Sequence, residues 1–154
     1  MHRSGARLAA SILALACCVG LTSRVLLAQE KPAETGKLAV SIEYKGKGTV
    51  DKDHRIWIWV FDTPEISASG TPVAFGDLSE NGGTFKFGGL PKQVYLAMAY
   101  DEKGGYDGTT GPPPPGTPVA IHGAAPGGGP AAAVPTGGEE AVLNASFDDS
   151  SRMP

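Results

Sequence analysis

The sequence predicts an all-β protein, a seven-stranded antiparallel Greek-key sandwich that follows an N-terminal signal helix. First, apolar residues recur at every second position in seven short segments. Second, no segment after residue 28 combines the period of a helix with capping residues. Third, Gly, Pro, Asn and Asp separate the segments at the spacing of hairpins. Seven short strands in about 110 residues are typical of a two-layer antiparallel fold.

Residues 1–28 are expected to be a secretory signal peptide. A basic start with Arg3 and Arg7 precedes the apolar run Leu8–Leu21, which is too short to cross a bilayer comfortably. Cleavage is expected after Ala28, and a polar leader, residues 29–36, follows. We therefore expect an exported protein, periplasmic or extracellular, whose mature chain has no membrane span.

The composition limits the chemistry of the mature chain. Cys17 and Cys18 are the only cysteines and lie inside the signal, so neither a disulfide nor a cysteine-ligated metal is expected after cleavage. A lipid anchor is disfavoured, because "ALAC" has no Leu three residues before the cysteine and "LACC" places a cysteine where a small residue is required. Cleavage leaves 10 basic residues against 16 acidic ones, a net charge of about −6. This balance argues against nucleic acid as a partner.

The first two strands are expected in "KLAVSIEYKG" and "RIWIWVFD". The second alternates aliphatic with aromatic side chains and has no polar face before Asp62. Since a sandwich has one core, one face of this strand needs a second cover. We expect the Pro-rich loop Gly111–Pro118 to cover the Trp face, or to cover the aliphatic face if the indoles point at the core.

The remaining strands are expected at residues 71–77, 83–89, 94–101, 117–123 and 140–149. The third and fourth are joined by a turn in which Asn81 and Gly82 accept positive φ. The fifth has an aliphatic-rich face and an opposite face that carries Tyr95, Ala97 and Ala99.

One domain, residues 37–149, is expected to contain all seven strands, with residues 150–154 as a tail. Two Gly- and Pro-rich loops, 104–118 and 123–138, interrupt it. The first is expected to be locally extended, because proline fixes φ and removes a donor. The second is expected to be mobile, because it has too few apolar side chains to order itself.

The run "GTFKFGGLPKQVYLAMAYDEKG", with "GKLAVSIEYKG" ahead of it, resembles the transthyretin-like or carboxypeptidase-regulatory-like group of Ig-like β-sandwiches. The resemblance covers residues 37–148 and implies a tight corner at Leu90 and Pro91, before a central strand that contains Tyr95. Lys92-Gln93 stands where the group usually has a glycine. Members that belong to enzymes serve as accessory domains, so the resemblance implies a module that acts through protein contacts and does not catalyse.

If strand direction alternates along the chain, the loops after the first, third and fifth strands and the segment after the seventh meet at one end. That end collects nine of the sixteen carboxylates. Carboxylates on Gly-rich loops are ligands that calcium accepts, and the candidate ligands are Asp101, Asp107, Asp148 and Asp149. The alternative is that these are solvated turn residues, because Asp is common in turns. No other cofactor is expected.

Trp57 and Trp59 lie two residues apart on one strand face, which spaces the indoles about 7 Å apart. Such a pair could stack on successive sugar rings and form a carbohydrate-binding platform. The alternative is that both indoles are packed under a cover.

No catalytic constellation is visible. The mature chain has no cysteine, and no serine lies in the context of a strained nucleophile turn. The sequence therefore predicts an exported non-catalytic module whose partner is an unknown protein. The alternative is a carbohydrate- or small-ligand-binding module, with calcium as a possible aid.

Overall fold

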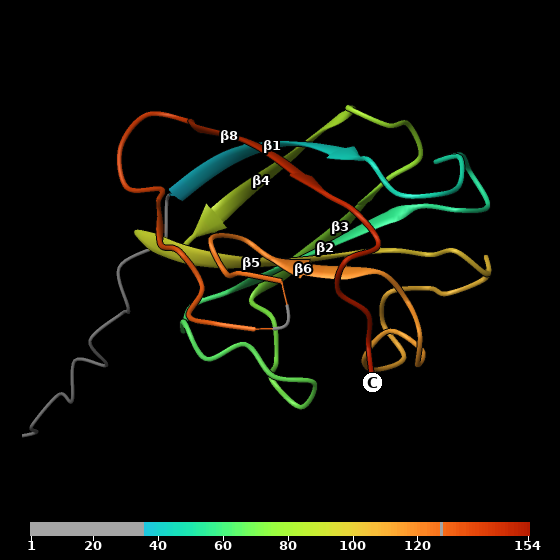
Figure 1. Cartoon of the computed structure of the whole chain (residues 1–154). Helices are drawn as coiled ribbons and strands as arrows, with labels where there is room; N and C mark the ends of the chain where they lie inside the picture. Colours follow the sequence, from blue (N-terminus) through green and yellow to red (C-terminus); the bar gives the residue numbers. More distant parts are fainter. Residues whose placement is uncertain (1–35, 127) are drawn as a thin grey trace, which may run out of the picture. The chain divides into compact units, whose positions relative to one another are not determined.

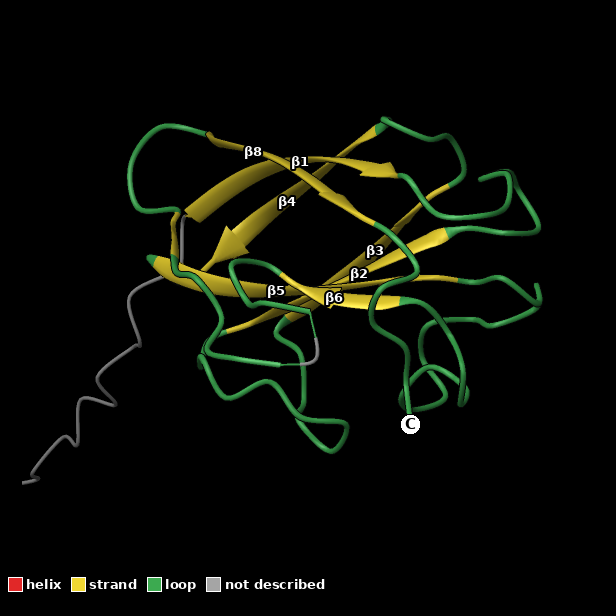
Figure 2. Ribbon diagram, viewed as in Figure 1, coloured by secondary structure: helices red, strands yellow, loops and turns green. Residues whose placement is uncertain are grey.

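The computed structural model describes residues 36–126 and 128–154. The predicted signal peptide and the leader as far as residue 35 lie outside the described residues. Within them every secondary-structure element is a β-strand and no helix is present (Figure 2). Accordingly, this part of the chain contains no helix that could cross a membrane. The all-β prediction is confirmed.

Eight strands form two sheets, which lie as two layers (Figure 1). The first sheet has the order β4 (Thr84–Leu90), β1 (Gly36–Tyr44), β8 (Ala141–Phe147). The second has the order β3 (Ala74–Leu78), β2 (Ile56–Phe61), β5 (Gln93–Tyr100), β6 (Val119–Ile121). A two-residue strand, β7 (Val134–Pro135), pairs with the start of β5. Each of the seven predicted segments overlaps a strand, although the bounds differ by a few residues, and β7 was not predicted.

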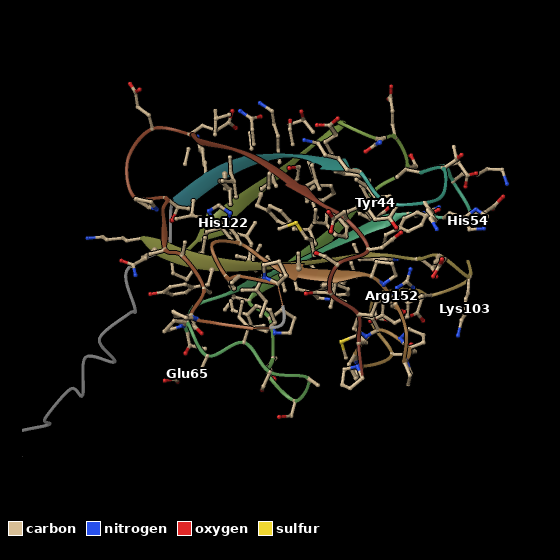
Figure 3. The ribbon with its side chains drawn as sticks, in the orientation of Figure 1. Tyr44, His54, Glu65, Lys103, His122 and Arg152 are labelled. Carbon is tan, nitrogen blue, oxygen red and sulfur yellow. The ribbon has the colours of Figure 1, made fainter. Side chains whose placement is uncertain are left out.

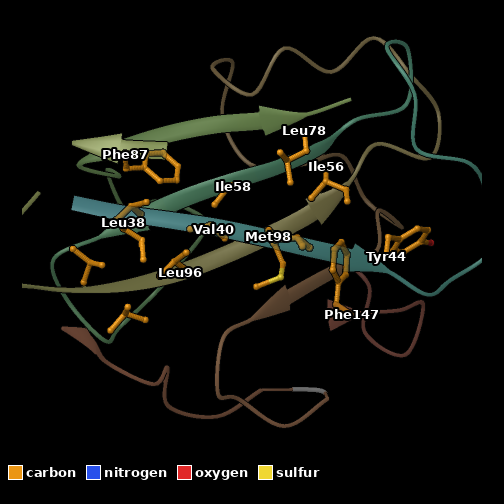
Figure 4. Packing of buried hydrophobic residues seen from close by; sticks show 14 of the residues in the cluster. Leu38, Val40, Tyr44, Ile56, Ile58, Leu78, Phe87, Leu96, Met98 and Phe147 are labelled. Atoms are coloured by element: carbon orange, nitrogen blue, oxygen red, sulfur yellow. The ribbon is translucent and has the colours of Figure 1, made fainter. Parts of the chain in front are cut away.

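Apolar side chains from both layers fill the space between the sheets (Figure 4). Those with no exposed surface are Leu38, Val40, Ile42, Ile56, Ile58, Val60, Val94 and Leu96. They alternate along β1, β2 and β5, as the period of two predicts. At one end of this core Tyr44 stacks on Tyr100, with ring centroids 4.2 Å apart, and Phe147 leans on Tyr44.

β2 is covered on both faces. Its aliphatic side chains point into the core, and its aromatic side chains point outward, yet all six residues are buried. Trp57, Trp59 and Phe61 are only 6%, 8% and 5% exposed. The prediction that β2 has one face on the core and a second cover over its Trp face is therefore confirmed.

The sheet topology differs from the predicted antiparallel arrangement in two ways. β1 and β8 are parallel neighbours over seven residue pairs. If the seven predicted strands alternate in direction, the first and the last run the same way. The alternation of apolar residues does not show, however, that these two strands are neighbours in a sheet. The second difference is that β3 and β4 lie in different sheets, so the turn at Asn81 and Gly82 crosses between layers. There the Asn81 amide accepts from the N–H of Tyr44 at 2.7 Å and donates to its carbonyl at 2.9 Å.

Segment 123–138 and the predicted tail pack more closely than expected. Val134 and Thr136 are 7% and 1% exposed, and the backbone N–H of Thr136 donates to the carbonyl of Lys92 at 2.9 Å. The prediction that this segment buries too little to pack is wrong for residues 134–136. In the tail, the N–H of Met153 donates to the carbonyl of Thr117 at 2.9 Å, which ties residues 151–153 to the entry of β6.

Candidate functional site

The outward face of the second sheet carries two neighbouring rows of cross-strand partners. From β3 through β2 and β5 to β6, the Trp57 row is Asp77, Trp57, Ala99, Val119, and the Trp59 row is Phe75, Trp59, Ala97, Ile121. Cross-strand partners lie about 5 Å apart, so each indole stands beside an alanine methyl group. A small side chain between large ones leaves a hollow over β5 in each row.

Tyr106, from the loop between β5 and β6, packs against the cluster formed by Trp57, Trp59, Phe61 and Ala99. Its ring centroid lies 5.7 Å from that of Trp57, edge to face at 76°, and 6.1 Å from that of Trp59. The Tyr106 backbone N–H donates to Oδ2 of Asp101 at 2.9 Å, and its hydroxyl donates to the carbonyl of Gly111. Burial raises the pKa of Tyr106, so the hydroxyl stays a neutral donor.

Gly108 follows Tyr106 closely and lies directly on the indoles. Its carbonyl accepts from Nε1 of Trp59 at 3.3 Å. Its φ is +72°, and a Cβ added there would lie 2.2 Å from the ring of Trp57. A glycine is therefore required on both conformational and steric grounds. The buried Nε1 of Trp57 has no acceptor among the described residues.

A cavity of about 420 Å³ lies beside the Trp59 row. Its floor includes Trp59 and Ala97, and its walls come from the loop after β2, the loop after β5 and the C-terminal Met153. Apolar wall residues include Ile66, Pro72, Phe75, Pro112, Pro113 and Val119. Among the described residues, no charged side chain lines it.

The structure brings the predicted ligand-binding residues Trp57 and Trp59 together on one face, but it covers them. Tyr106 packs on both rings, so these indoles do not form an open stacking platform in the described structure. Only Trp59 reaches the cavity. The predicted cover, residues 111–118, is wrong in detail, because the packed residue is Tyr106, while Pro112 and Pro113 line the cavity.

The aspartates predicted as calcium ligands lie in the loops after β5 and β8. Asp101 accepts a hydrogen bond from the backbone N–H of Tyr106. Asp107 accepts hydrogen bonds from the backbone N–H groups of Thr109 and Thr110 at 2.9 and 3.0 Å. These bonds, with that of the Thr110 hydroxyl, hold the pKa of the Asp107 carboxyl below its usual range.

After β8, the hydroxyl and N–H of Ser150 lower the pKa of Asp148. Asp149 accepts the hydroxyl of Tyr44 and the N–H of Lys47, which lower the pKa of its carboxyl. Each of the four aspartates thus accepts at least one hydrogen bond from the protein itself.

The loops do meet at one end, as the alternating direction predicts. Arg152, from the segment after β8, donates to Glu102, from the loop after β5, at 2.7 Å. Even so, among residues 36–126 and 128–154 no three His, Cys, Asp or Glu side chains are grouped to hold a metal. The calcium prediction gains no support from this geometry. His54 and His122, the two histidines among the described residues, lie far apart (Figure 3).

A second feature is the edge of the first sheet formed by β8. In the described chain β8 pairs only with β1. The N–H of Lys45 donates to the carbonyl of Phe147 at 2.8 Å, so the backbone groups of Phe147 point to β1. Because direction alternates along a strand, those of Val142, Asn144 and Ser146 point to the free edge.

A groove of about 780 Å³ runs between this edge and β6. Its apolar lining includes Met98, Ala120, Ala145 and Phe147, and Lys45, His122, Asp148 and Arg152 also line it. The strand facing it, Ala141–Phe147, carries no charge and no proline. The other long edges differ, since β4 carries Lys86 and β3 carries Asp77.

Sequence reasoning missed Tyr106, Ala97 and Gly108. A signal was present, because two alanines opposite two tryptophans require a bulky cover, and Tyr106 is the only aromatic residue of the loop that follows β5. Compared with known proteins, the chain matches no family model, no curated protein and no solved structure.

Proposed function

We propose that this chain is an exported, non-catalytic module that acts through protein contacts, built as a transthyretin-like Greek-key β-sandwich. Two sheets that share one core support the architecture. The basic and apolar N-terminal sequence supports export. The single observation that carries the protein-contact proposal is the free, uncharged edge of β8.

An edge strand presents unpaired N–H and C=O groups that pair readily with another chain. Proteins usually protect such edges with charge, proline, a bulge or short length. β8 is seven residues long and carries neither a charged residue nor a proline. Its exposed side chains are Val142, Asn144 and Ser146. An edge left in this state is suited to pairing.

The fitting partner is an extended segment of another protein that adds a strand to β8. Its backbone would bond the groups of residues 142, 144 and 146, while every second side chain would enter the groove toward β6. Half-buried Leu143 and Ala145, on the core-facing side of β8, would gain cover from these side chains. The groove therefore favours apolar residues at alternate positions of the partner.

The test uses the exported full chain and a display library of random ten-residue peptides. We expect enriched peptides with apolar residues at alternate positions. Asn144→Pro removes a free-edge N–H and should weaken binding of an enriched peptide at least about tenfold. Asn144→Ala keeps the N–H and is the matched control, with binding expected within about twofold.

Two results would contradict the proposal: no enrichment, or enrichment that Asn144→Pro leaves unchanged. If the chain forms a dimer that Asn144→Pro dissociates, the partner at the β8 edge is a second copy of this chain and not another protein. Mass spectrometry of the exported chain checks the export proposal separately, with an N-terminus at residue 29 as the expected result.

A small-ligand module is the second candidate, and the cavity beside Trp59 is the observation that favours it. A carbohydrate-binding platform would need Trp57 and Trp59 to be exposed, but Tyr106 packs on both rings. Calcium is tested separately by thermal melting with calcium and with chelator, and an unchanged midpoint would remove it.

A further inference from the structure

The two rows on the outward face of the second sheet are built alike but filled differently. In the Trp57 row Ala99 is only 1% exposed, and the phenol ring of Tyr106 packs against the cluster that contains Trp57 and Ala99. The space over Ala97, in the Trp59 row, belongs to the cavity of about 420 Å³. An empty apolar space forgoes the dispersion contacts that close packing supplies. The molecule thus fills one hollow with its own aromatic ring and leaves the adjacent one open.

The walls define the charge of what fits there. Within residues 36–126 and 128–154, no Asp, Glu, Lys, Arg or His lines the cavity, so a charged ligand would be desolvated there without a partner. Its polar side chains are hydroxyls of Ser67, Thr71 and Thr109. These can donate to or accept from a hydroxyl or carbonyl group, which adds direction without requiring charge. The complementary ligand is neutral, with few polar groups.

The walls also define its shape. Trp59, Phe61 and Phe75 present aromatic surfaces, and Pro112 and Pro113 face the same space from the loop after β5. Flat rings pack on such surfaces by offset or edge-to-face contact, as Tyr106 does on Trp57. The volume lies within the range of ordinary small-molecule sites, about 300–1,000 Å³.

The cavity opens beside an unusually exposed apolar rim. Phe75 and Val73 are 49% and 45% exposed, and they are two of the three exposed large hydrophobic residues in the described chain. Phe75 lines the cavity, and Val73 follows Pro72, which also lines it. Exposed apolar side chains gathered at a cavity mouth are characteristic of binding sites.

We propose that this cavity binds a neutral small molecule with a planar aromatic ring, which lies over Ala97 against Trp59. The ring takes the position relative to Trp59 that Tyr106 takes relative to Trp57. The cavity shares Met98, Val119, Ala120 and Ile121 with the groove beside β8. Phe75 and Ala97 line only the cavity, and Asn144 lines only the groove, so variants at these residues distinguish failure of one proposal from failure of the other.

The test compares two probes that differ by one charge. N-phenyl-1-naphthylamine is neutral, and 1-anilinonaphthalene-8-sulfonate is the same molecule with a sulfonate. With the exported full chain we expect the fluorescence of the neutral probe to increase and saturate, with a Kd of roughly 10 μM. The bound probe should also fluoresce when tryptophan is excited, by energy transfer. The sulfonate should bind at least about tenfold more weakly, because its charge finds no partner in the cavity.

Two variants locate the site. Ala97→Leu fills the floor and should weaken the neutral probe at least about tenfold. Phe75→Ala removes a half-exposed rim ring with little risk to folding, and should weaken the probe about threefold to tenfold. Val142→Ala trims an exposed side chain on the other sheet and is the matched control, with unchanged affinity expected.

Absence of saturable binding, equal affinity for both probes, or affinity that Phe75→Ala leaves unchanged would overturn the proposal. The occupant is checked by displacement with 2-naphthol and with N-acetyl-tryptophanamide. Stronger displacement by 2-naphthol is expected. Stronger displacement by the amide would assign the cavity to a side chain of a partner protein and overturn a free ligand.

Discussion

The two faces of β2 are both buried, but they are covered by different kinds of structure. The inner face belongs to the core between the two sheets, and Ile56, Ile58 and Val60 have no exposed surface. The outer face meets loops, and Trp57 and Trp59 keep 6% and 8% exposure beside an open cavity.

The difference follows from periodicity. A facing sheet offers a side chain at every second residue, which matches the pleat and closes every hollow. A loop covers only where it carries a large side chain, and the loop after β5 supplies one ring, Tyr106. The inner face therefore supplies stability, and the outer face leaves space for binding.

The largest effect should come from the inner face. Ile58→Ala creates a cavity between the sheets and should lower the free energy of unfolding by about 4 kcal/mol. Urea denaturation followed by circular dichroism measures it. The control is Val142→Ala, at a residue 71% exposed, with a change within about 0.5 kcal/mol. Similar losses for the two variants would contradict the assignment of the core.

The second prediction tests how tightly the loop lies on the indoles. Gly108→Ala introduces a side chain at φ +72° and 2.2 Å from Trp57, and should cost about 3 kcal/mol. Gly105→Ala, at φ +86° with nothing within 4 Å, is the matched control and should cost about 1 kcal/mol. The difference, measured by urea denaturation, isolates the contact with the indole. Equal costs would mean that the loop moves aside freely.

The same contrast explains how much the sequence could predict. The alternation in β1, β2 and β5 is local, so the strands, their inner faces and the need for a cover over Trp57 and Trp59 were all predictable. The parallel pairing of β1 with β8 was not, because a period of two carries no information about which distant strand lies alongside. The crossing at Asn81 and Gly82 was missed for the same reason, since the turn residues suit a hairpin equally well.

The site shows a similar limit. Strand direction correctly placed Asp101, Asp107, Asp148 and Asp149 at one end of the sheets. Whether they converge depends on side-chain hydrogen bonds, and each carboxylate accepts from groups of its own or a neighbouring loop. The cavity was not predictable, because it depends on where Tyr106 stops covering the outward face.

The third prediction concerns how the cover is fastened. Tyr106→Phe keeps the ring on Trp57 but removes the hydroxyl that donates to Gly111, and should cost about 1 kcal/mol. We expect faster limited proteolysis within residues 107–116, because local opening of the loop becomes easier. Tyr95→Phe removes a hydroxyl bonded to Gln93 on the same sheet face and should leave this cleavage rate unchanged.

The smallest effect should come from acid at the end of the inner core. Asp149 accepts the hydroxyl of Tyr44, whose ring closes that end, and this bond lowers the pKa of Asp149 below its unfolded value. A carboxylate with a lowered folded pKa adds stability above its unfolded pKa, near 4, and loses it as the pH falls through the folded value.

Stability should therefore be level from pH 7 to about pH 5 and fall below about pH 4. Asp149→Asn should reduce this dependence, so that variant and wild type differ most near neutrality and converge in acid. Asp62→Asn makes the same charge change beyond the opposite end of β2 and is the control. Urea midpoints from pH 3 to pH 7 measure all three. If Asp149→Asn left the curve parallel to that of the wild type, Asp149 would not hold Tyr44, and the inner face would owe its closure to ring packing with Tyr100 and Phe147.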